Sequence, residues 1–425
     1  MKAEMRVAKP LNVWIVNPYG TLPDEAWREY RSSMLASALR AAGHRVTWWI
    51  SNFEHRDKRF RTPRFERREL ADGTIVNIVP TTAYAGHISL ARIKSEQVYA
   101  RGVAALALSA QQDRPDLIVL AEPSLFFGGL ILAMARRLGV PIVSDILDLW
   151  PELFTLVLPR PLRPLQRLVF APLYWRRART LRASRGIVAV SRDYLNIGLH
   201  AAPGKPSLVS YLGVDVASVR TAAKDAARVL AQLDIAPKVS GEIWVIYAGT
   251  LGENYDIASI IGAMEDERLR QLPVRFLFAG NGPQREMLRA ACNRSQGRAR
   301  YLGTLEPASL NALYTQCDIG LSTYLEGSTV SMPVKFYDYL AGGLAVVNSL
   351  GREIGTQVTE RRLGLQYGAG DARSLADALV ALTEFPELLA EYRRNASEAA
   401  MAFDQRAQHD RYVQFLTSLV ENPTC

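Results

Sequence analysis

The sequence predicts an α/β protein with two successive parallel-sheet domains. Short apolar runs alternate with helix-like stretches along the whole chain, which is the pattern of βα units. This series restarts after residue 240, and 425 residues suffice for two to three domains at ~150 residues each. Two Rossmann-like halves therefore fit both the pattern and the length.

The first half contains the apolar runs of one parallel sheet. Buried strands are expected at 11–17, 45–50, 75–79, 116–120, 141–146, 187–191 and 207–211. Helices are expected at 24–42, at 91–109, before Gly139 and along a stretch that ends at Arg185. We assign 1–215 to this N-terminal domain. Residues 216–240 show no strand pattern and hold many Ala, Lys and Asp, so we interpret them as a linker.

The second half repeats the alternation. Strands are expected at 243–247, 274–279, 300–302, 319–322 and 345–348, and helices at 256–264, 283–292, 307–316 and 334–340. From residue 371 onward the sequence is almost wholly helical. A second Rossmann-like domain is therefore expected over 241–400.

Composition excludes several classes of protein. Hydrophobic residues make up 48% and charged residues 22% of the chain, as in soluble globular proteins. The longest charge-free apolar stretch, Pro123–Ala135, is shorter than the ~20 residues of a membrane-spanning helix. The N-terminal apolar run is too short for a signal peptide, and the 3 cysteines form no disulfide framework. We therefore expect a cytoplasmic protein.

The charge is unevenly distributed. The formal net charge is +9, and the stretch from Arg160 to Arg185 contains arginines but no acidic residue. Such an excess suits anionic lipids, nucleic acids or phosphorylated ligands. Apolar and aromatic residues such as Leu168 and Trp175 interleave with these arginines, which favours a helix lying on an anionic membrane surface. A core helix with a solvated basic face is the alternative. No nucleic-acid-binding motif accompanies the charge, so we expect no nucleic-acid partner.

Glycine-rich loops follow the expected strands of the second half. In an open parallel sheet, ligands bind at the loops beyond the carboxyl ends of the strands. One such loop holds Gly249, Thr250, Gly252 and Asn254, and the next holds Gly280 and Asn281, with Pro283 expected in the first helical turn. Glycines allow close backbone approach, and free amides at a helix start favour phosphate. Ordinary glycine turns are the alternative at both places.

The loop that starts at Glu326 is the most informative one. It leads into a helix for which Ser331 is the expected N-cap, with Pro333 in the first turn. The free amides there form an anion site, and Lys335 adds a full positive charge. Asp338 follows three residues later on the same helical face. A surface ion pair between Lys335 and Asp338 is the alternative.

The order of these motifs resembles the donor half of glycosyltransferase family 4. The segments are Ala-Gly-Thr-Leu-Gly at 248–252, Ala-Gly-Asn-Gly-Pro at 279–283, Tyr-Leu-Gly-Thr at 301–304, Cys-Asp-Ile-Gly-Leu at 317–321 and Met-Pro-Val-Lys-Phe-Tyr-Asp-Tyr-Leu-Ala-Gly-Gly at 332–343. In the first half, Asn-Pro-Tyr-Gly at 17–20, Ala-Gly-His-Arg-Val at 42–46 and Asp-Leu-Trp-Pro-Glu at 148–152 are similar to members that build bacterial surface polysaccharides. The order of these segments across roughly residues 11–370, more than any one of them, makes the match specific.

The resemblance implies a GT-B fold, with two domains facing a cleft, and a retaining enzyme that uses nucleotide-sugar donors. It implies that a C-terminal helix, within 401–425, crosses back to the N-terminal domain. It places Asn254 and Gly252 near the pyrophosphate, Lys335 on the donor phosphates and Asp338 on the ribose. Ser331 and Met332 would offer backbone amides, and Leu305 would contact the base.

The sequence departs from the family pattern at three positions. The ribose position holds Asp338 where Glu is usual, which shortens its reach by one methylene. Val330 stands where many members place a first Glu, and Glu326 is the nearest acid. The basic residue often found in the glycine loop is absent, which leaves more of the phosphate charge to Lys335.

The first half is expected to bind the acceptor, a lipid-linked or glycan molecule. Candidate acceptor-binding residues are Gly20, Arg31, His87, Asp145 and Asp148. Asp145 and Asp148 follow a predicted strand, and Asp148 could orient the acceptor hydroxyl. A helix-capping role is the alternative for Asp148, a solvated histidine for His87 and an exposed helical position for Arg31. Many relatives carry His where this chain has Leu147.

The expected mechanism needs no cofactor and no metal. The diphosphate of a nucleotide sugar is a good leaving group, so Lys335 and fixed amides have to stabilise its growing charge. We assign the catalytic roles to Lys335, Asp338 and Asp148. For a retaining enzyme of this kind, the leaving phosphate can take the acceptor proton. Two alternatives remain at this point: a nucleotide-sugar epimerase on the same fold, and a two-lobed binding protein without activity.

Overall fold

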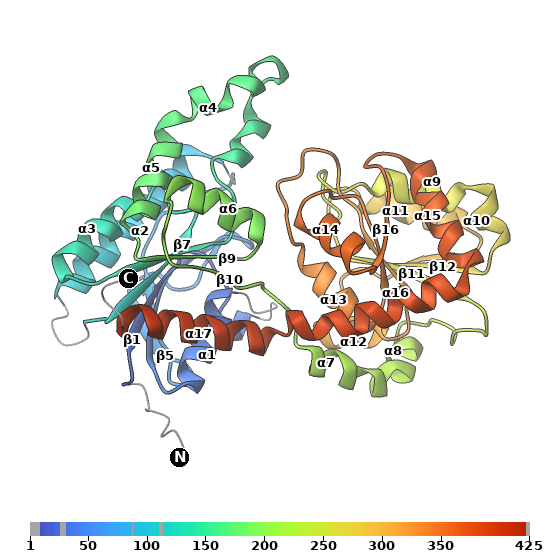
Figure 1. Cartoon of the computed structure of the whole chain (residues 1–425), viewed down its shortest axis with the longest axis horizontal. Coiled ribbons are helices and arrows are strands. Elements are labelled where there is room, and N and C mark those ends of the chain that lie inside the picture. Colours follow the sequence, from blue (N-terminus) through green and yellow to red (C-terminus); the bar gives the residue numbers. More distant parts are fainter. Residues whose placement is uncertain (1–8, 26–30, 87, 110–113, 422–425) are drawn as a thin grey trace. The chain divides into compact units, whose positions relative to one another are not determined.

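The computed structural model describes residues 9–25, 31–86, 88–109 and 114–421, which form two compact units (Figure 1). The first unit comprises Met1–Tyr211 and Gln408–Cys425, and the second comprises Leu212–Ala407. Each unit has its own parallel sheet covered by helices. Among the described residues, no helix combines the length and apolarity that crossing a bilayer requires.

The first unit contains an eight-stranded sheet in the order β10-β9-β8-β7-β1-β2-β6-β5. Its strands are β1 (Asn12–Val16), β2 (Arg45–Ser51), β5 (Glu66–Glu69), β6 (Ile75–Val79), β7 (Leu117–Glu122), β8 (Ile142–Ile146), β9 (Gly186–Ala189) and β10 (Ser207–Val209). All neighbours are parallel except β5, which pairs antiparallel with β6 at the edge. β5 has the sequence Glu-Arg-Arg-Glu, so it gives no apolar signal and was not expected. A small hairpin of β3 (Phe53–Glu54) and β4 (Arg59–Phe60) lies outside this sheet.

Helices cover the first sheet. They are α1 (Arg31–Ala41), α2 (Leu90–Ser109), α3 (Gly128–Leu138), α5 (Ala171–Ala183) and α6 (Arg192–Ala201). The helical stretch expected to run to Arg185 is broken into η2 (Glu152–Val157), η3 (Arg160–Leu165), α4 (Gln166–Val169) and α5. Prolines at positions 159, 161, 164 and 172 explain the breaks, because proline lacks the N–H that a continuous helix needs.

The last helix, α17 (Gln405–Glu421), belongs to the first unit from Gln408 onward. Tyr412, Leu416 and Leu419 are buried there in the same core as Val13 and Val143 of the sheet. The C-terminal end of the chain thus helps to close the hydrophobic core that begins with β1.

The second unit contains a fully parallel six-stranded sheet in the order β13-β12-β11-β14-β15-β16. Its strands are β11 (Ile243–Ala248), β12 (Val274–Ala279), β13 (Ala299–Tyr301), β14 (Ile319–Ser322), β15 (Ala345–Asn348) and β16 (Gly364–Gln366). Its helices include α9 (Ile257–Glu265), α10 (Glu267–Gln271), α11 (Arg285–Arg294), α12 (Pro307–Tyr314), α13 (Val334–Gly342), α14 (Glu353–Glu360), α15 (Ala372–Glu384) and α16 (Pro386–Ala399). Residues near the centre, such as Val245, Phe276 and Leu321, are completely buried.

Residues 216–240 are part of the second unit, where the sequence suggested only a linker. They contain α7 (Val216–Ala222), η4 (Ala223–Asp225) and α8 (Ala226–Gln232). Val216, Val219 and Val229 are buried on their inner faces. Two helices of seven residues joined by a 3-10 turn are each too short to give a clear periodicity, which is why the segment resembled a connection.

Both sheets have a point at which the strand order reverses. In the second unit the chain leaves β11 towards β12 and β13, and then returns on the other side through β14. In the first unit the same reversal separates β1 from β7. Loops diverge at such a point and leave a crevice beyond the carboxyl ends of the strands.

Candidate active site

The reversal point of the second sheet brings the loops after β11 and β14 together. The N–H of Leu325, after β14, donates to the carbonyl of Asn254, after β11, at 3.1 Å. Glu326 follows directly and is exposed, as is Asn254. The segment then leads to Lys335 in the first turn of α13. Residues predicted from two separate motifs therefore flank one crevice.

The glycine loops after β11 and β12 are packed backbone to backbone. A Cβ on Gly280 would lie 1.8 Å from the carbonyl oxygen of Gly249, and one on Gly282 would lie 2.5 Å from that of Leu251. Gly249 and Gly280 have φ angles of +142° and +137°. A Cβ on Gly249 would itself come within 3.3 Å of Lys335 Nζ. A side chain at Gly280 or Gly282 would collide with the backbone of the loop after β11, and one at Gly249 would crowd Lys335 Nζ. These glycines therefore do more than form ordinary turns, because they let the two loops pack together beside Lys335.

Helix α13 starts at the residue where the alternation of strands and helices placed it, but its N-cap differs from the predicted one. It begins at Val334 with Pro333 as N-cap and no side-chain cap, so the prediction that Ser331 is the N-cap was wrong. The cause is Pro333, because the residue before a proline is kept out of the helical region. Among the described residues, the backbone N–H groups of Val334 and Lys335 have no acceptor. These two amides and the positive end of the helix dipole form an anion site.

Lys335 lies in an aromatic cage. Its Nζ is 3.9 Å from the ring centre of Tyr247, 4.9 Å from that of Tyr255 and 5.3 Å from that of Tyr324. The residue is 8% exposed, and within the described part of the chain Nζ makes no hydrogen bond. Leaving a buried ammonium unpaired is costly, and cation–π contacts offset only part of that cost. The site is therefore poised to accept an anion.

Burial also changes the protonation of Lys335. It lowers the pKa of Lys335 from 10.5 to about 7, because the charged form loses its hydration without gaining a carboxylate. An anion bound at Nζ would restore the charge and raise this pKa again. The ammonium thus becomes fully charged when its ligand arrives.

Asp338, Ser331 and Met332 are buried beside this lysine. Asp338 is 5% exposed and forms no ion pair with Lys335, which removes the alternative of a surface ion pair. Ser331 is 1% exposed, and its carbonyl accepts from the N–H of Ile354 at 3.2 Å. These residues directly flank or follow the start of α13 and are buried there. Their contacts with a donor stay predictions.

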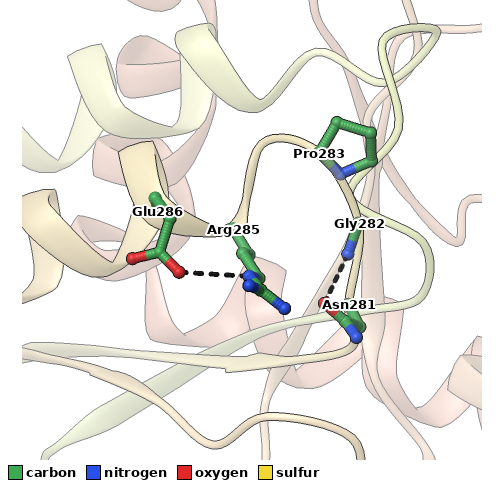
Figure 2. Close-up of a pocket in the computed structure, with 5 residues that line it drawn as sticks. All are labelled: Asn281, Gly282, Pro283, Arg285 and Glu286. Carbon is green, nitrogen blue, oxygen red and sulfur yellow. Dashed lines mark hydrogen bonds and ion pairs between the residues drawn. The ribbon is translucent and has the colours of Figure 1, made fainter.

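A hollow of about 500 Å³ lies at the end of β12, beside the glycine loops. Figure 2 shows its lining by Asn281, Gly282, Pro283, Arg285 and Glu286, with Asn281 Oδ1 accepting from the N–H of Gly282 at 2.8 Å. Arg285 Nε and Glu286 form an ion pair at 3.1 Å. The hollow is open to solvent and adjoins the loop that holds Gly249.

Pro283 precedes α11 instead of lying in its first turn as predicted. Gln284 is the N-cap, and the helix begins at Arg285. The N–H of Gln284 donates to the carbonyl of Leu251 at 3.0 Å, and its side chain donates to the carbonyls of Gly252 and Tyr255. These bonds hold the turn out of the helix and fix the glycine loop. No motif in the sequence marks Gln284 for this role.

Two further donor-site predictions lie on neighbouring loops. Thr250 is exposed, and its carbonyl accepts from the Tyr247 hydroxyl at 2.6 Å. Leu305 is half-buried and precedes α12 at the end of β13, the strand next to β12. Leu305 thus lies two strands away from β11, and its contact with a base stays a prediction.

In the first unit, Arg31 and Asp145 bind each other. Arg31 Nε donates to Asp145 Oδ2 at 2.9 Å and its Nη2 to Oδ1 at 3.0 Å, and both side chains are 3% exposed. Arg31 Nη1 also donates to the carbonyl of Ser210, and the guanidinium lies over the ring of Tyr412. Arg31 is therefore not an exposed helical arginine. This contact joins α1, β8 and α17, so it has a structural role, and the acceptor-binding role of both residues stays a prediction.

The other acceptor-site predictions lie around the loops after β1 and β8. Gly20 has a φ of +144°, and a Cβ there would lie 2.6 Å from the Trp48 ring. Asp148 accepts from the N–H of Leu149 at 2.8 Å, and burial raises its pKa. His87 lies outside the described residues.

Sequence reasoning missed a buried charged cluster near the reversal point of the first sheet. Arg92 Nε donates to the hydroxyl of Tyr19 at 2.9 Å and to Glu96 at 3.1 Å. The guanidinium also lies 4.4 Å from the ring centre of Trp150, and its charge lowers the pKa of Asp148 against the larger effect of burial. Arg92 and Glu96 are one helical turn apart, and in a sequence that spacing cannot be told from a surface ion pair. Tyr19 belongs to the quoted Asn-Pro-Tyr-Gly motif, which was the available signal.

Two family models match the chain. One describes group 1 glycosyl transferases and matches residues 242–384, which include every donor-site residue discussed above. The other describes a glycosyl transferase 4-like domain and matches residues 29–197. No curated protein is similar enough in sequence to match.

Solved structures with the same fold cover nearly the whole chain. Sucrose-phosphate synthase from Thermosynechococcus elongatus is 16% identical with a TM-score of 0.72, over 97% of this chain and 99% of its own. A trehalose 6-phosphate synthase from Burkholderia multivorans is 16% identical with a TM-score of 0.70, over 98% and 100%. Anabaena HepE in complex with UDP-glucose is 15% identical with a TM-score of 0.65, over 96% and 99%. At this identity the likeness shows the fold, which is GT-B.

Proposed function

The chain is a glycosyltransferase with the GT-B fold, and we propose that it moves a sugar from a UDP- or GDP-activated donor to a lipid-linked or glycan acceptor. We further propose retention of the anomeric configuration and a role in bacterial cell-surface polysaccharide synthesis, at the inner face of the cytoplasmic membrane. The observation that carries the donor assignment is Lys335 Nζ, a buried ammonium that finds no hydrogen-bond partner among the described residues and lies beside two amides without an acceptor there.

In the proposed reaction the donor diphosphate lies against the start of α13. The bond between the anomeric carbon and the diphosphate oxygen breaks, and the acceptor oxygen forms a bond to that carbon on the same face. The acceptor proton passes to the leaving phosphate. The Lys335 ammonium and the amides of Val334 and Lys335 stabilise the negative charge that the diphosphate gains. In this proposal they take the place of a metal ion.

The donor nucleotide is proposed from the same loops. Asp338 would bind the ribose, Leu305 the base, and Asn254 and Gly252 the pyrophosphate. HepE, which shares the fold, was solved with UDP and with UDP-glucose, and this supports a uridine nucleotide. We propose that Asp148 orients the acceptor hydroxyl, with its raised pKa set by burial near the charged Arg92 cluster.

We propose that the first unit contacts an anionic membrane surface through residues 160–185. The small buried area of this segment supports the proposal, because α4 buries no residue and α5 buries only Thr180 and Leu181. Large apolar side chains are instead exposed, among them Leu168 at 75% and Trp175 at 58%. In Figure 1 the segment that carries α4 extends away from the sheet of this unit.

The test measures nucleotide release from UDP-, GDP- and ADP-sugars, with and without membrane lipid extract. We expect release from one donor, accelerated by the extract, and a rise in unfolding temperature with the matching nucleotide. Lys335→Ala should lower the rate by ~10²–10³-fold, whereas Lys224→Ala, an exposed lysine of the same unit, should leave it unchanged. Donor interconversion without an acceptor would instead show an epimerase. Nucleotide binding without turnover would show a binding protein.

A further inference from the structure

A groove in the first unit opens beside the loop that follows β7, one of the two strands at the reversal point of the sheet. It has a volume of about 460 Å³ and is lined by residues of α2, α5 and the segment that leads into α3. Three arginines lie on its walls: Arg101 of α2, and Arg176 and Arg179 of α5. Arg101 lies outside the arginine-rich stretch and is brought to it only by the fold.

No described carboxylate pairs with these three arginines. Among the described residues, none of their guanidinium groups forms a hydrogen bond or ion pair. Their contacts are with rings: Arg176 lies 5.8 Å from the ring centre of Phe126, and Arg179 lies 5.5 Å from that of Trp175. The neighbouring Arg177 differs, because it is paired with Glu152 at 2.6 Å. Unpaired arginines converging on one groove indicate an anionic ligand.

The surrounding helices offer no competing negative charge. α3 and α5 contain no acidic residue, and α2 contains one, Glu96, which is buried against Arg92. The groove floor is also held in place: Ser124 donates from its N–H and its hydroxyl to the fully buried Glu122, at 2.6 and 2.9 Å. Glu122 is buried, and its two hydrogen bonds fix Ser124 in the groove lining.

The rim of the groove is apolar. Trp175 and Leu130 are 58% and 40% exposed, and the elements that precede α5 in the chain, η3 and α4, expose Leu165, Leu168 and Val169 as well. A free phosphate ion would gain nothing from these side chains. The anionic headgroup of a lipid, with acyl chains beside it, uses both the arginines and the apolar rim.

We propose that this groove binds the phosphate of an anionic membrane phospholipid and so fixes how the first unit lies on the bilayer. The proposal deepens the membrane contact of the proposed function by naming its site and ligand. Arg101, Arg176 and Arg179 hold the phosphate, and Trp175 and Leu130 enter the interfacial region. Lipid binding here is independent of donor binding in the second unit.

The test is sedimentation with vesicles of phosphatidylcholine, with and without phosphatidylglycerol, in the absence of donor and acceptor. We expect binding only to the anionic vesicles. Replacing Arg101, Arg176 and Arg179 by Gln should weaken it on the order of 100-fold. The matched control replaces the exposed Arg45, Arg136 and Arg137 of the same unit by Gln and should weaken it far less. Equal losses in both variants would show binding by net charge alone and overturn the proposal.

A second pair of variants keeps the arginines. Gly129 lines the groove and has open space at its Cβ position, so Gly129→Glu places a carboxylate among the guanidiniums. Ala133→Glu makes the same change in charge one turn further along α3, outside the lining. We expect only Gly129→Glu to abolish sedimentation. Full competition by inorganic phosphate would identify a free-phosphate site and contradict the proposal. UDP should still raise the unfolding temperature of a variant that no longer sediments with vesicles. Loss of lipid binding is then distinguished from a failure of the donor assignment.

Discussion

The two units hold their buried charges differently. In the second unit, Lys335 is buried in a cage of tyrosines, and its Nζ has no hydrogen-bond partner in the part of the chain that the structure describes. In the first unit, Arg31 is paired with Asp145, and Arg92 is bonded to Tyr19 and Glu96. Both arrangements lie near the carboxyl ends of a parallel sheet. Of these three side chains, Lys335 is the one that no carboxylate among the described residues pairs with. Lys58 of the first unit also has no hydrogen bond on Nζ and lies 4.7 Å from the ring centre of Tyr84, but it is only half-buried.

The presence or absence of a partner distinguishes a charged side chain that binds a ligand, such as Lys335, from one that supports the fold, such as Arg31. A buried charge with a good partner supports the fold, whereas a buried charge without one is retained at a cost in stability. The donor site can therefore be identified from the second unit alone. The acceptor residues of the first unit are harder to identify, because pairing masks whatever further role they have.

The largest expected effect tests the structural role of the paired residues. Arg31→Leu should lower the free energy of unfolding of the first unit by ~3–5 kcal/mol, because it leaves Asp145 buried without a partner. The double variant with Asp145→Leu should recover much of that loss. Urea denaturation measures both, and the exposed Arg59→Leu provides the control at under ~1 kcal/mol. A loss for Arg31→Leu as small as that of the control would show that the pair does not support the fold.

The next effect sharpens the contrast at Lys335. Lys335→Met should reduce turnover by ~10²–10³-fold, since the group that stabilises the leaving diphosphate is gone. The same change should raise the free energy of unfolding by ~1–3 kcal/mol, because a buried ammonium without an acceptor is removed. Steady-state kinetics and thermal unfolding measure the two results. A variant that is less stable than the parent would contradict our description of the cage.

A smaller effect concerns the glycine loops. Gly280→Ala should weaken the free energy of UDP binding by ~1–3 kcal/mol, because the φ of +137° and the carbonyl of Gly249 leave no room for a Cβ. Gly297→Ala also has a positive φ, of +84°, but meets nothing within 4 Å. Calorimetric titration with UDP compares the two variants. Equal affinities would show that the packing of the two loops does not shape the donor site.

The smallest effect is a proton count. The pKa of Lys335 is lowered to about 7 by burial, so at pH 8 most free molecules hold it neutral. Bound diphosphate should raise this pKa, and UDP binding should then take up close to one proton, ~0.9 at pH 8. In the free protein, the contribution of Lys335 to the free energy of unfolding rises with pH between about pH 7 and the ordinary lysine pKa. In that range the lysine is protonated in the unfolded state and neutral in the folded state. Titration in two buffers of different ionisation enthalpy measures the uptake, which Lys335→Met should abolish.

Much of the fold could be predicted because its strands are buried apolar runs. β6, β12, β14 and β15 begin and end where the alternation places them. The elements that were missed are those without such a signal, such as the charged edge strand β5 and the short helices α7 and α8. Proline positions 159–172 would have revealed the broken helices, because proline interrupts helical hydrogen bonding.

The site was predictable to the extent that its residues lie in short motifs. Lys335 and the glycine loops each lie in a short recognisable motif, and the motifs converge as expected although they are far apart in sequence. Gln284 and Arg92 could not be assigned, because their roles depend on partners 29 residues away and more, which only the fold brings near. The burial of Lys335 is likewise a property of Tyr247, Tyr255 and Tyr324 together, and these stand on three separate segments.

The central claim is that Lys335 and the start of α13 receive the donor diphosphate. A crystal structure of the chain with UDP tests it most directly. We expect a phosphate oxygen within hydrogen-bonding distance of Lys335 Nζ and of the N–H of Val334. A well-ordered diphosphate that contacts neither group would contradict the account.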